Sequence, residues 1–352
     1  MTKSPILTTT IGSFPKPAYV PIRDWFDASR ESTGMNDATI TRDFSLDEEH
    51  EPLFLRAAKE VLDIQVQAGV DVPTDGEVRR ENYIHYHCRQ IEGFDFQNLE
   101  HRVLRDGAYE TDLPAIRGEI IHPFPGYGAR DWRAAQDLCD RPVKMTLPGP
   151  LTIMDTTADC HYDDRVRLNK ALGDTINLEV RALAEAGCRY IQIDEPLFAR
   201  QVLDALDFGM EGLERCFHGI PKDVQRVVHM CCGYPEFLDD EDYKKADRDS
   251  YTRLATATNE AAFDQVSLED AHQHNDLRLL ELFPSKTIIL GTVAVARSRV
   301  ETYEEIRDRL LEALEHIDRE RLIVAPDCGL GLLTPELAEA KLTAMCKAAH
   351  SV

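Results

Sequence analysis

The 352-residue chain lacks any apolar run close to the ~20 residues that a membrane-spanning helix needs. Its first residues, Met1 to Ile6, include no apolar segment of the kind that forms the core of a secretory signal. These two absences argue against membrane insertion and against secretion. We therefore expect a cytoplasmic protein with no membrane partner.

Positive charge is scarce as well. The chain has 40 Lys and Arg residues against 63 Asp and Glu residues, which gives a formal net charge of −23. A surface of that sign repels phosphate backbones, so we expect no nucleic-acid partner. The nine cysteines are odd in number and irregularly spaced. This pattern excludes the framework of a small secreted disulfide protein, and we expect most of the thiols to be reduced and structural.

Several motifs that identify common enzyme classes are missing too. The sequence has no G-x-S-x-G elbow, no P-loop and no C-x-x-C pair. The Gly126-Tyr127-Gly128 stretch lacks the third glycine and the strand and helix of a dinucleotide-binding loop. Serine hydrolase, nucleotide-binding and thioredoxin-like functions therefore have no support.

The chain does show a regular alternation of strand-like runs and helical stretches. Such alternation predicts an α/β fold with a parallel sheet. Eight steps match the (β/α)8 TIM barrel, formed by residues 1–352 as a single domain. A doubly wound sheet stays an alternative, because the strand count is inferred from sequence. The expected strands are Leu7–Ile11, Val70–Pro73, Val143–Leu147, Tyr190–Ile193, Val227–Cys232, Gln265–Glu269, Thr287–Gly291 and Leu322–Cys328.

Residues 80–141 interrupt this alternation with aromatic side chains and glycine-rich turns. We interpret them as an insertion after the second strand that forms a lid or hairpin over the mouth of the fold. A helix is expected before that strand, beginning at Ser45, which fits a capping box with Glu48. Further helices are expected near residues 166–186, 302–316 and 335–349.

One strand-like run ends in a histidine and a cysteine two residues apart. In an extended strand side chains alternate between faces, so His229 and Cys231 project to the same side. Two later strands end in Glu269 and Cys328, and imidazole, thiolate and carboxylate all bind zinc. A short His-x-Cys pattern is weak by itself, because cysteine is often buried as a small apolar residue. The three strand ends together predict a Zn²⁺ site formed by His229, Cys231, Glu269 and Cys328.

Six stretches, in order, resemble the C-terminal catalytic barrel of the cobalamin-independent methionine synthase family, within the superfamily that includes uroporphyrinogen decarboxylase. The likeness covers nearly the whole chain. The six stretches identify the family only in combination, because each alone is a weak signal. They are Thr8–Pro15, Asp75–Glu77, Pro148–Ile153, Ile191–Pro196, His229–Cys231 and Pro326–Leu330.

The resemblance implies a zinc-dependent methyltransferase that forms methionine from homocysteine. It implies zinc ligands at the same four positions. It also places the homocysteine on Ile11 and Ser13, and it places the homocysteine ammonium group on the carboxylates of Glu77 and Asp194. These residues lie at or just after the ends of predicted strands, where barrel enzymes carry their catalytic groups.

Departures from the family pattern concern the methyl donor. The family's folate-stacking tryptophan aligns with Thr156, a carboxylate after D-E-P aligns with Arg200, and the histidine that protonates the leaving nitrogen aligns with Ala296. The N-terminal barrel of the full-length family enzymes is not expected here. The sequence therefore leaves the donor open between methyltetrahydrofolate and a methylcorrinoid, the latter with a corrinoid protein as a partner. His272, His274 or a residue of the 80–141 segment is an alternative proton donor.

Two other hypotheses stay open. The family includes enzymes that open epoxides with a small thiol, such as epoxyalkane:coenzyme M transferase, but Glu77 and Asp194 would have no role with a sulfonate thiol. A closed structural zinc in a binding protein is the other, and ligands from distant strands that include a displaceable carboxylate argue against it.

Overall fold

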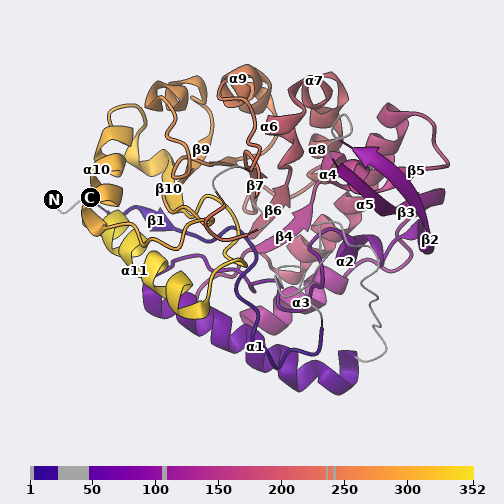
Figure 1. Cartoon of the computed structure of the whole chain (residues 1–352), viewed down its shortest axis with the longest axis horizontal. Coiled ribbons are helices and arrows are strands. Elements are labelled where there is room, and N and C mark those ends of the chain that lie inside the picture. Colours follow the sequence, from indigo (N-terminus) through magenta and orange to yellow (C-terminus); the bar gives the residue numbers. More distant parts are fainter. Residues whose placement is uncertain (1–3, 23–46, 105–108, 235–236, 241–242) are drawn as a thin grey trace.

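The computed structural model describes residues 4–22, 47–104, 109–234, 237–240 and 243–352. Its centre is a curled, parallel seven-stranded sheet (Figure 1) in the order β1-β10-β9-β8-β7-β6-β4. The strands are β1 (Leu7–Thr8), β4 (Met145–Pro148), β6 (Tyr190–Asp194), β7 (Gln225–Met230), β8 (Gln265–Leu268), β9 (Thr287–Gly291) and β10 (Leu322–Ala325).

The two edges of this sheet are linked through the segment expected to form the second strand. Val72 makes an isolated parallel bridge with Thr9, after β1, and Thr74 makes another with Lys144, before β4. Pro73 lies between them and has no N–H to donate, which disfavours a continuous ladder. The expected parallel α/β fold is confirmed, and its neighbouring strands follow in chain order, unlike a doubly wound sheet. The segment Val70–Pro73 is not a regular strand, so the prediction of eight regular strands was wrong in that element.

Helices cover the outer face of the sheet (Figure 1) because that face is apolar. The longer ones are α1 (Asp47–Ala68), α5 (Arg165–Ala186), α9 (Ser250–Glu260), α10 (Tyr303–Ala313) and α11 (Pro335–Ser351). The expected capping residue Ser45 lies outside the described residues.

Helix α5 shows how the sequence sets such an element. Asp164 accepts a hydrogen bond from the Arg167 amide at its start, and Gly187 ends it with a φ of 108°. Leu172, Ile176 and Val180 recur at helical spacing and are buried against the sheet layer.

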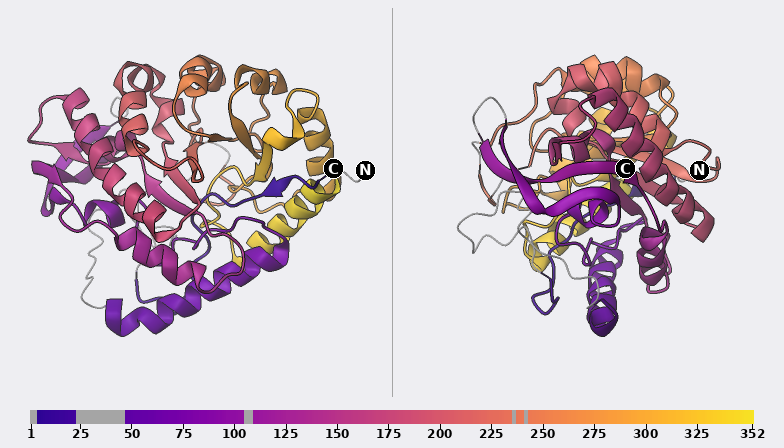
Figure 2. Two further views of the ribbon diagram at one scale, coloured as in Figure 1. Left: turned by 180° about the vertical axis from the view of Figure 1, so that it is seen from behind. Right: turned by 90° about the vertical axis from the view of Figure 1, so that its right-hand side faces the viewer.

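Residues 80–141 contain a long antiparallel hairpin made of β2 (Glu92–Leu104) and β3 (Tyr109–Ile121). Strand β5 (Ala158–Asp159) adds to β3 in parallel. This second sheet lies beside α5 and away from α10 and α11 (Figures 1 and 2). The short helices are α2 (His85–Cys88), α3 (Tyr127–Gln136), α4 (Pro150–Asp155), α6 (Leu197–Arg200), α7 (Val202–Asp204), the π-helix η3 (Ala205–Gly209), α8 (Met210–Cys216), and the 3₁₀ helices η4 (Leu277–Leu282) and η5 (Arg319–Arg321).

The inner face of the sheet differs from the outer face. Near the middle of the strands it holds a small apolar cluster that includes Val227, Ile289 and Ile323. Toward the carboxyl ends it carries buried polar side chains, among them Gln192 and His229. Buried polar groups need partners, so this end of the sheet is where a functional site is expected. Within the described residues, no helix is both long enough and apolar enough to cross a membrane.

Candidate active site

Three of the predicted metal ligands converge at the carboxyl ends of β7 and β10. Ligand atoms of His229, Cys231 and Cys328 all lie within 4.8 Å of one another. His229 is in β7 and Cys231 follows that strand on the same face, as the two-residue spacing predicts. Cys232 faces the other way, toward Tyr251. All nine cysteine thiols are free.

The imidazole of His229 is held in an orientation that suits a metal ligand. Its Nδ1 lies 3.0 Å from the hydroxyl oxygen of Ser267, which is its neighbour in β8. Its Nε2 is buried and has no hydrogen-bond partner among the described residues. Histidine ligands commonly donate one ring N–H to such a partner and bind the ion through the other nitrogen. One imidazole and two thiols fit zinc.

The two cysteines share a hydrogen bond that separates their acidities. The Cys328 thiol lowers the pKa of Cys231 well below its usual range, and His229 acts in the same direction. The same hydrogen bond raises the pKa of Cys328, and burial adds to that effect. One thiolate is therefore favoured at this position before any ion is considered.

Glu269, the fourth predicted ligand, lies next to this group and contacts other residues. Its Oε2 accepts a hydrogen bond of 3.0 Å from the Cys232 amide, and its Oε1 forms an ion pair with Lys245. Together with His272 and Asp327 it forms a second group of possible ligand atoms. The structure thus brings three of the four residues together and places Glu269 in the adjacent cluster.

Asp327 and His272 in that cluster serve to hold the loop after β8. Asp327 accepts hydrogen bonds from the amides of Asp270, Ala271 and His272, and from His272 Nδ1 at 2.7 Å. The other ring nitrogen of His272 accepts the Ala296 amide at 3.0 Å. Both nitrogens of His272 are therefore engaged. The side chain of His274, the other candidate proton donor, is 65% exposed.

The predicted substrate residues line a cavity of about 100 Å³ with the same three ligands. Ile11, Ser13, Glu77 and Asp194 all contribute to its wall. Gln192 donates to Asp194 Oδ1 at 2.7 Å, and burial raises the pKa of Asp194 to about 7. Gly329, in the loop after β10, leaves room for Ser13, because a Cβ there would lie 2.2 Å from the serine hydroxyl.

Glu77, the other predicted partner of the ammonium group, already has polar partners in the structure. One of its oxygens accepts hydrogen bonds from Thr146 at 2.9 Å and Arg80 at 3.2 Å. Its backbone has a φ of 58°, which is unusual for a residue other than glycine. Burial raises its pKa, and Arg80 opposes that shift. Of the two carboxylates predicted to bind substrate, Asp194 is the one without a cationic hydrogen-bond partner among the described residues.

Four supporting residues were not predicted from the sequence, namely Arg80, Gln192, Ser267 and Lys245. Ser267 lies in β8, two residues before Glu269, so strand alternation was a usable signal for it. Lys245 lies in a loop 24 residues before its partner, and no local pattern marks it.

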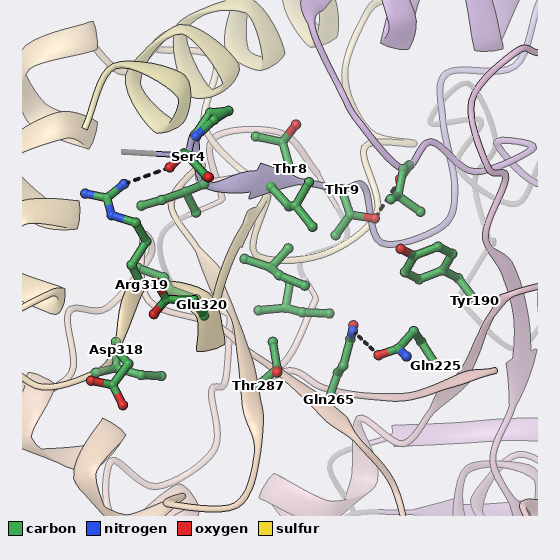
Figure 3. Close-up of a pocket in the computed structure, with 18 of the residues that line it drawn as sticks. Ser4, Thr8, Thr9, Tyr190, Gln225, Gln265, Thr287, Asp318, Arg319 and Glu320 are labelled. Atoms are coloured by element: carbon green, nitrogen blue, oxygen red, sulfur yellow. Dashed lines mark hydrogen bonds between the residues drawn. The ribbon is translucent and has the colours of Figure 1, made fainter. Parts of the chain in front are cut away.

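A larger cavity of about 910 Å³ lies at the opposite, amino ends of the strands (Figure 3). Its wall includes Thr8, Gln225, Gln265 and Thr287, and most of the other side chains that line it are uncharged. It contains none of the cysteine or histidine ligands. Size alone would point to this cavity, whereas the chemistry is concentrated in the smaller one.

Comparison with known proteins decides the family. A family model described as "Cobalamin-independent synthase, Catalytic domain" matches residues 6–351. The chain belongs to the cobalamin-independent methionine synthase family. A methionine synthase of Saccharolobus islandicus is 31% identical over 348 residues, which cover 98% of this chain and 94% of the relative. One of Saccharolobus solfataricus is 30% identical with the same coverage.

A solved structure agrees with this assignment. The B12-independent methionine synthase of Shewanella sp. W3-18-1, in complex with selenomethionine, matches with a TM-score of 0.83 and 28% identity. The match covers 98% of this chain and 97% of that chain. Membership makes the protein a methyltransferase of methionine biosynthesis and implies methyl transfer to homocysteine. The epoxide-opening alternative is not favoured by these relatives.

Proposed function

We propose that the protein is a zinc-dependent homocysteine S-methyltransferase, with His229, Cys231, Cys328 and Glu269 as the zinc ligands. The observation that carries this proposal is one cavity that holds an imidazole, two thiols and the carboxylate of Asp194. Glu269 is the ligand we expect to exchange for the substrate, because carboxylate oxygen is a weaker partner than thiolate and already has Lys245 beside it.

A zinc ion held by these side chains supplies the positive charge that stabilises a thiolate relative to a thiol. The protein residues supply orientation. Ser267 fixes the ring of His229. Asp194 attracts the ammonium group of homocysteine, with the second oxygen of Glu77 as a further acceptor. Ser13 and the backbone of Ile11 are the proposed contacts for the rest of the amino acid. Selenomethionine in the Shewanella relative supports an amino-acid site in this fold.

The choice between the two methyl donors depends on whether the site contains a group that can protonate the leaving nitrogen. Methyl transfer from a folate leaves a nitrogen anion unless a general acid protonates it. The position aligned with the family's histidine is Ala296, and His272 beside it has both ring nitrogens engaged. We therefore propose slow turnover with methyltetrahydrofolate and faster turnover with a methylcorrinoid, delivered free or by a corrinoid protein.

Two proposals about architecture accompany this function. The curled sheet and the Val72–Thr74 bridges form a closed (β/α)8 barrel that makes up a single domain. The hairpin of β2 and β3 belongs to an insertion, residues 80–141, whose first part reaches the cavity through Tyr83 and Ile84.

Methionine formation from homocysteine tests the proposed function. The zinc-loaded protein is assayed with methyltetrahydrofolate and with methylcobalamin, each with homocysteine or with the same-length thiol lacking the amino group. We expect a preference for homocysteine of about tenfold or more, because charge-assisted hydrogen bonds are worth roughly 1.5–3 kcal/mol. Asp194→Asn should remove that preference, and Asp159→Asn, on β5, should keep it. A preference that survives Asp194→Asn would remove homocysteine as the acceptor.

A further inference from the structure

Arg200 is an arginine without a partner in the wall of the catalytic cavity. It ends α6 and lines the same cavity as Cys231 and Cys328. Its guanidinium makes no hydrogen bond or ion pair with any residue that the structure describes. Arg226, a half-buried arginine elsewhere in the molecule, is by contrast paired with Asp264. An unpaired guanidinium facing a binding cavity is a ready site for an oxyanion.

The neighbours of Arg200 do not compete for this role. Asp155 also lines the cavity, but its carboxylate accepts a hydrogen bond from Gln201 at 2.8 Å and forms no ion pair with Arg200. The hydroxyl of Thr156 donates to the carbonyls of Thr152 and Ile153. Pro196 and Leu197 supply apolar wall. Among the described residues that line the cavity, Arg200 is therefore the one lysine or arginine.

The other ionisable side chains in the cavity wall are mostly acidic groups and thiols. The wall carries Asp194, Glu77 and two cysteine sulfurs, in a protein with a formal charge of −23. A negatively charged ligand entering this cavity is repelled unless a local cation compensates. Asp194 and Glu77 are the proposed partners of homocysteine. Arg200 is therefore left for the second substrate.

We propose that Arg200 binds an anionic group, a carboxylate or a phosphate, of the methyl donor. This inference rests on the proposed function, in which the second substrate is a methyl donor. It adds that the donor carries an anionic group. A glutamate carboxylate of a folate and the phosphodiester of a cobalamin both meet that requirement.

Equilibrium binding to the zinc-loaded protein without homocysteine tests the inference, because no turnover occurs. Two matched pairs of probes are titrated by calorimetry. One pair is methyltetrahydrofolate and its glutamate diamide, and the other is methylcobalamin and methylcobinamide, which lacks the phosphate together with its ribose and base. Arg200→Gln is compared with the wild type, with Arg200→Lys, and with Arg253→Gln, which changes an exposed arginine of α9.

We expect the wild type to bind the member of one pair that carries the carboxylate or phosphate at least about tenfold more tightly than the member that lacks it. The pair that shows this preference identifies the source of the anion. Arg200→Gln should abolish the preference while leaving the affinity for the member without the anionic group unchanged. Arg200→Lys should keep part of the preference, and Arg253→Gln should keep all of it. No preference in either pair, or a preference that survives Arg200→Gln, overturns the inference. Absence of methionine formation with every donor would instead count against the proposed function. The binding titrations would still decide whether Arg200 binds an anionic group.

Discussion

At the scale of single residues, strand alternation accounts for the ligand cluster. His229 and Cys231 share a face and Cys232 points away, which follows from a period of two. Side-chain partners across the fold could not be predicted in this way. The ion pair of Glu269 with Lys245 depends on how a loop returns to the sheet, and the loop sequence carries no periodic signal.

The neighbouring cysteines provide a matched test of the ligand set. Cys328→Ser should lower the zinc content of the purified protein from about one ion per chain, because loss of one of four ligands leaves an open, weakly held ion. Cys232→Ser should keep full zinc content, since that thiol faces Tyr251. Metal analysis of both variants checks this. Full occupancy in Cys328→Ser, or equal loss in both, would contradict the assignment.

Lys144 is a buried lysine in the interior of the fold, and its burial lowers the free energy of unfolding at neutral pH. It is 1% exposed, its Nζ has no hydrogen-bond partner among the described residues, and burial lowers its pKa from 10.5 to about 7. Above pH 10.5 the amine is neutral in both the folded and the unfolded chain. As the pH falls toward 7, the unfolded chain takes up the proton first, so the free energy of unfolding decreases across this window.

Lys144→Met should therefore stabilise the protein, and more at pH 7 than at pH 9. The difference in unfolding free energy between variant and wild type should shrink by about 2 kcal/mol between these two values, because one pKa unit corresponds to about 1.4 kcal/mol. Urea denaturation at both pH values measures it. Lys170→Met, on the surface of α5, should show no such pH dependence. A destabilised Lys144→Met protein would show that the amine has a partner that matters.

At the scale of elements, regular strands and long helices were predicted well. Helix α5 was expected over 166–186 and spans Arg165–Ala186, because its apolar spacing and terminal glycine are both local signals. The second strand was over-predicted. Its β-branched residues suit a strand, but Pro73 disfavours a continuous ladder, and only isolated bridges form.

The loop after β8 is held by the carboxylate of Asp327, which follows β10, and this gives an element-scale prediction. Asp327→Asn should destabilise the fold by about 2–4 kcal/mol, because a buried anion that accepts four hydrogen bonds becomes a neutral group with two donors of its own. Amide hydrogen exchange at Ala271 should accelerate. Asp308→Asn, at an exposed ion pair, should change stability by less than about 0.5 kcal/mol. Unchanged exchange at Ala271 would mean that the loop is held by other contacts.

At the scale of the whole molecule, the order of strands brings residues from distant parts of the chain to one end of a curled sheet. Asp194 and His229 are register partners in adjacent strands, and Cys328 arrives from the last strand. The parallel α/β class and the cluster were therefore predictable together, because parallel strands in chain order bring their carboxyl ends to one edge of the sheet. The sequence could not reveal that Glu77 is already held by Arg80, because that contact arises in a turn with an unusual backbone conformation.

X-ray absorption at the zinc edge, recorded with and without homocysteine, tests the central claim most directly. For the zinc-loaded protein alone the account predicts a first shell of two sulfur atoms together with nitrogen and oxygen, from Cys231, Cys328, His229 and Glu269. Addition of homocysteine should raise the number of sulfur ligands from two to three and remove an oxygen. A shell that keeps the same sulfur count when homocysteine is bound would contradict activation of the thiol at this site.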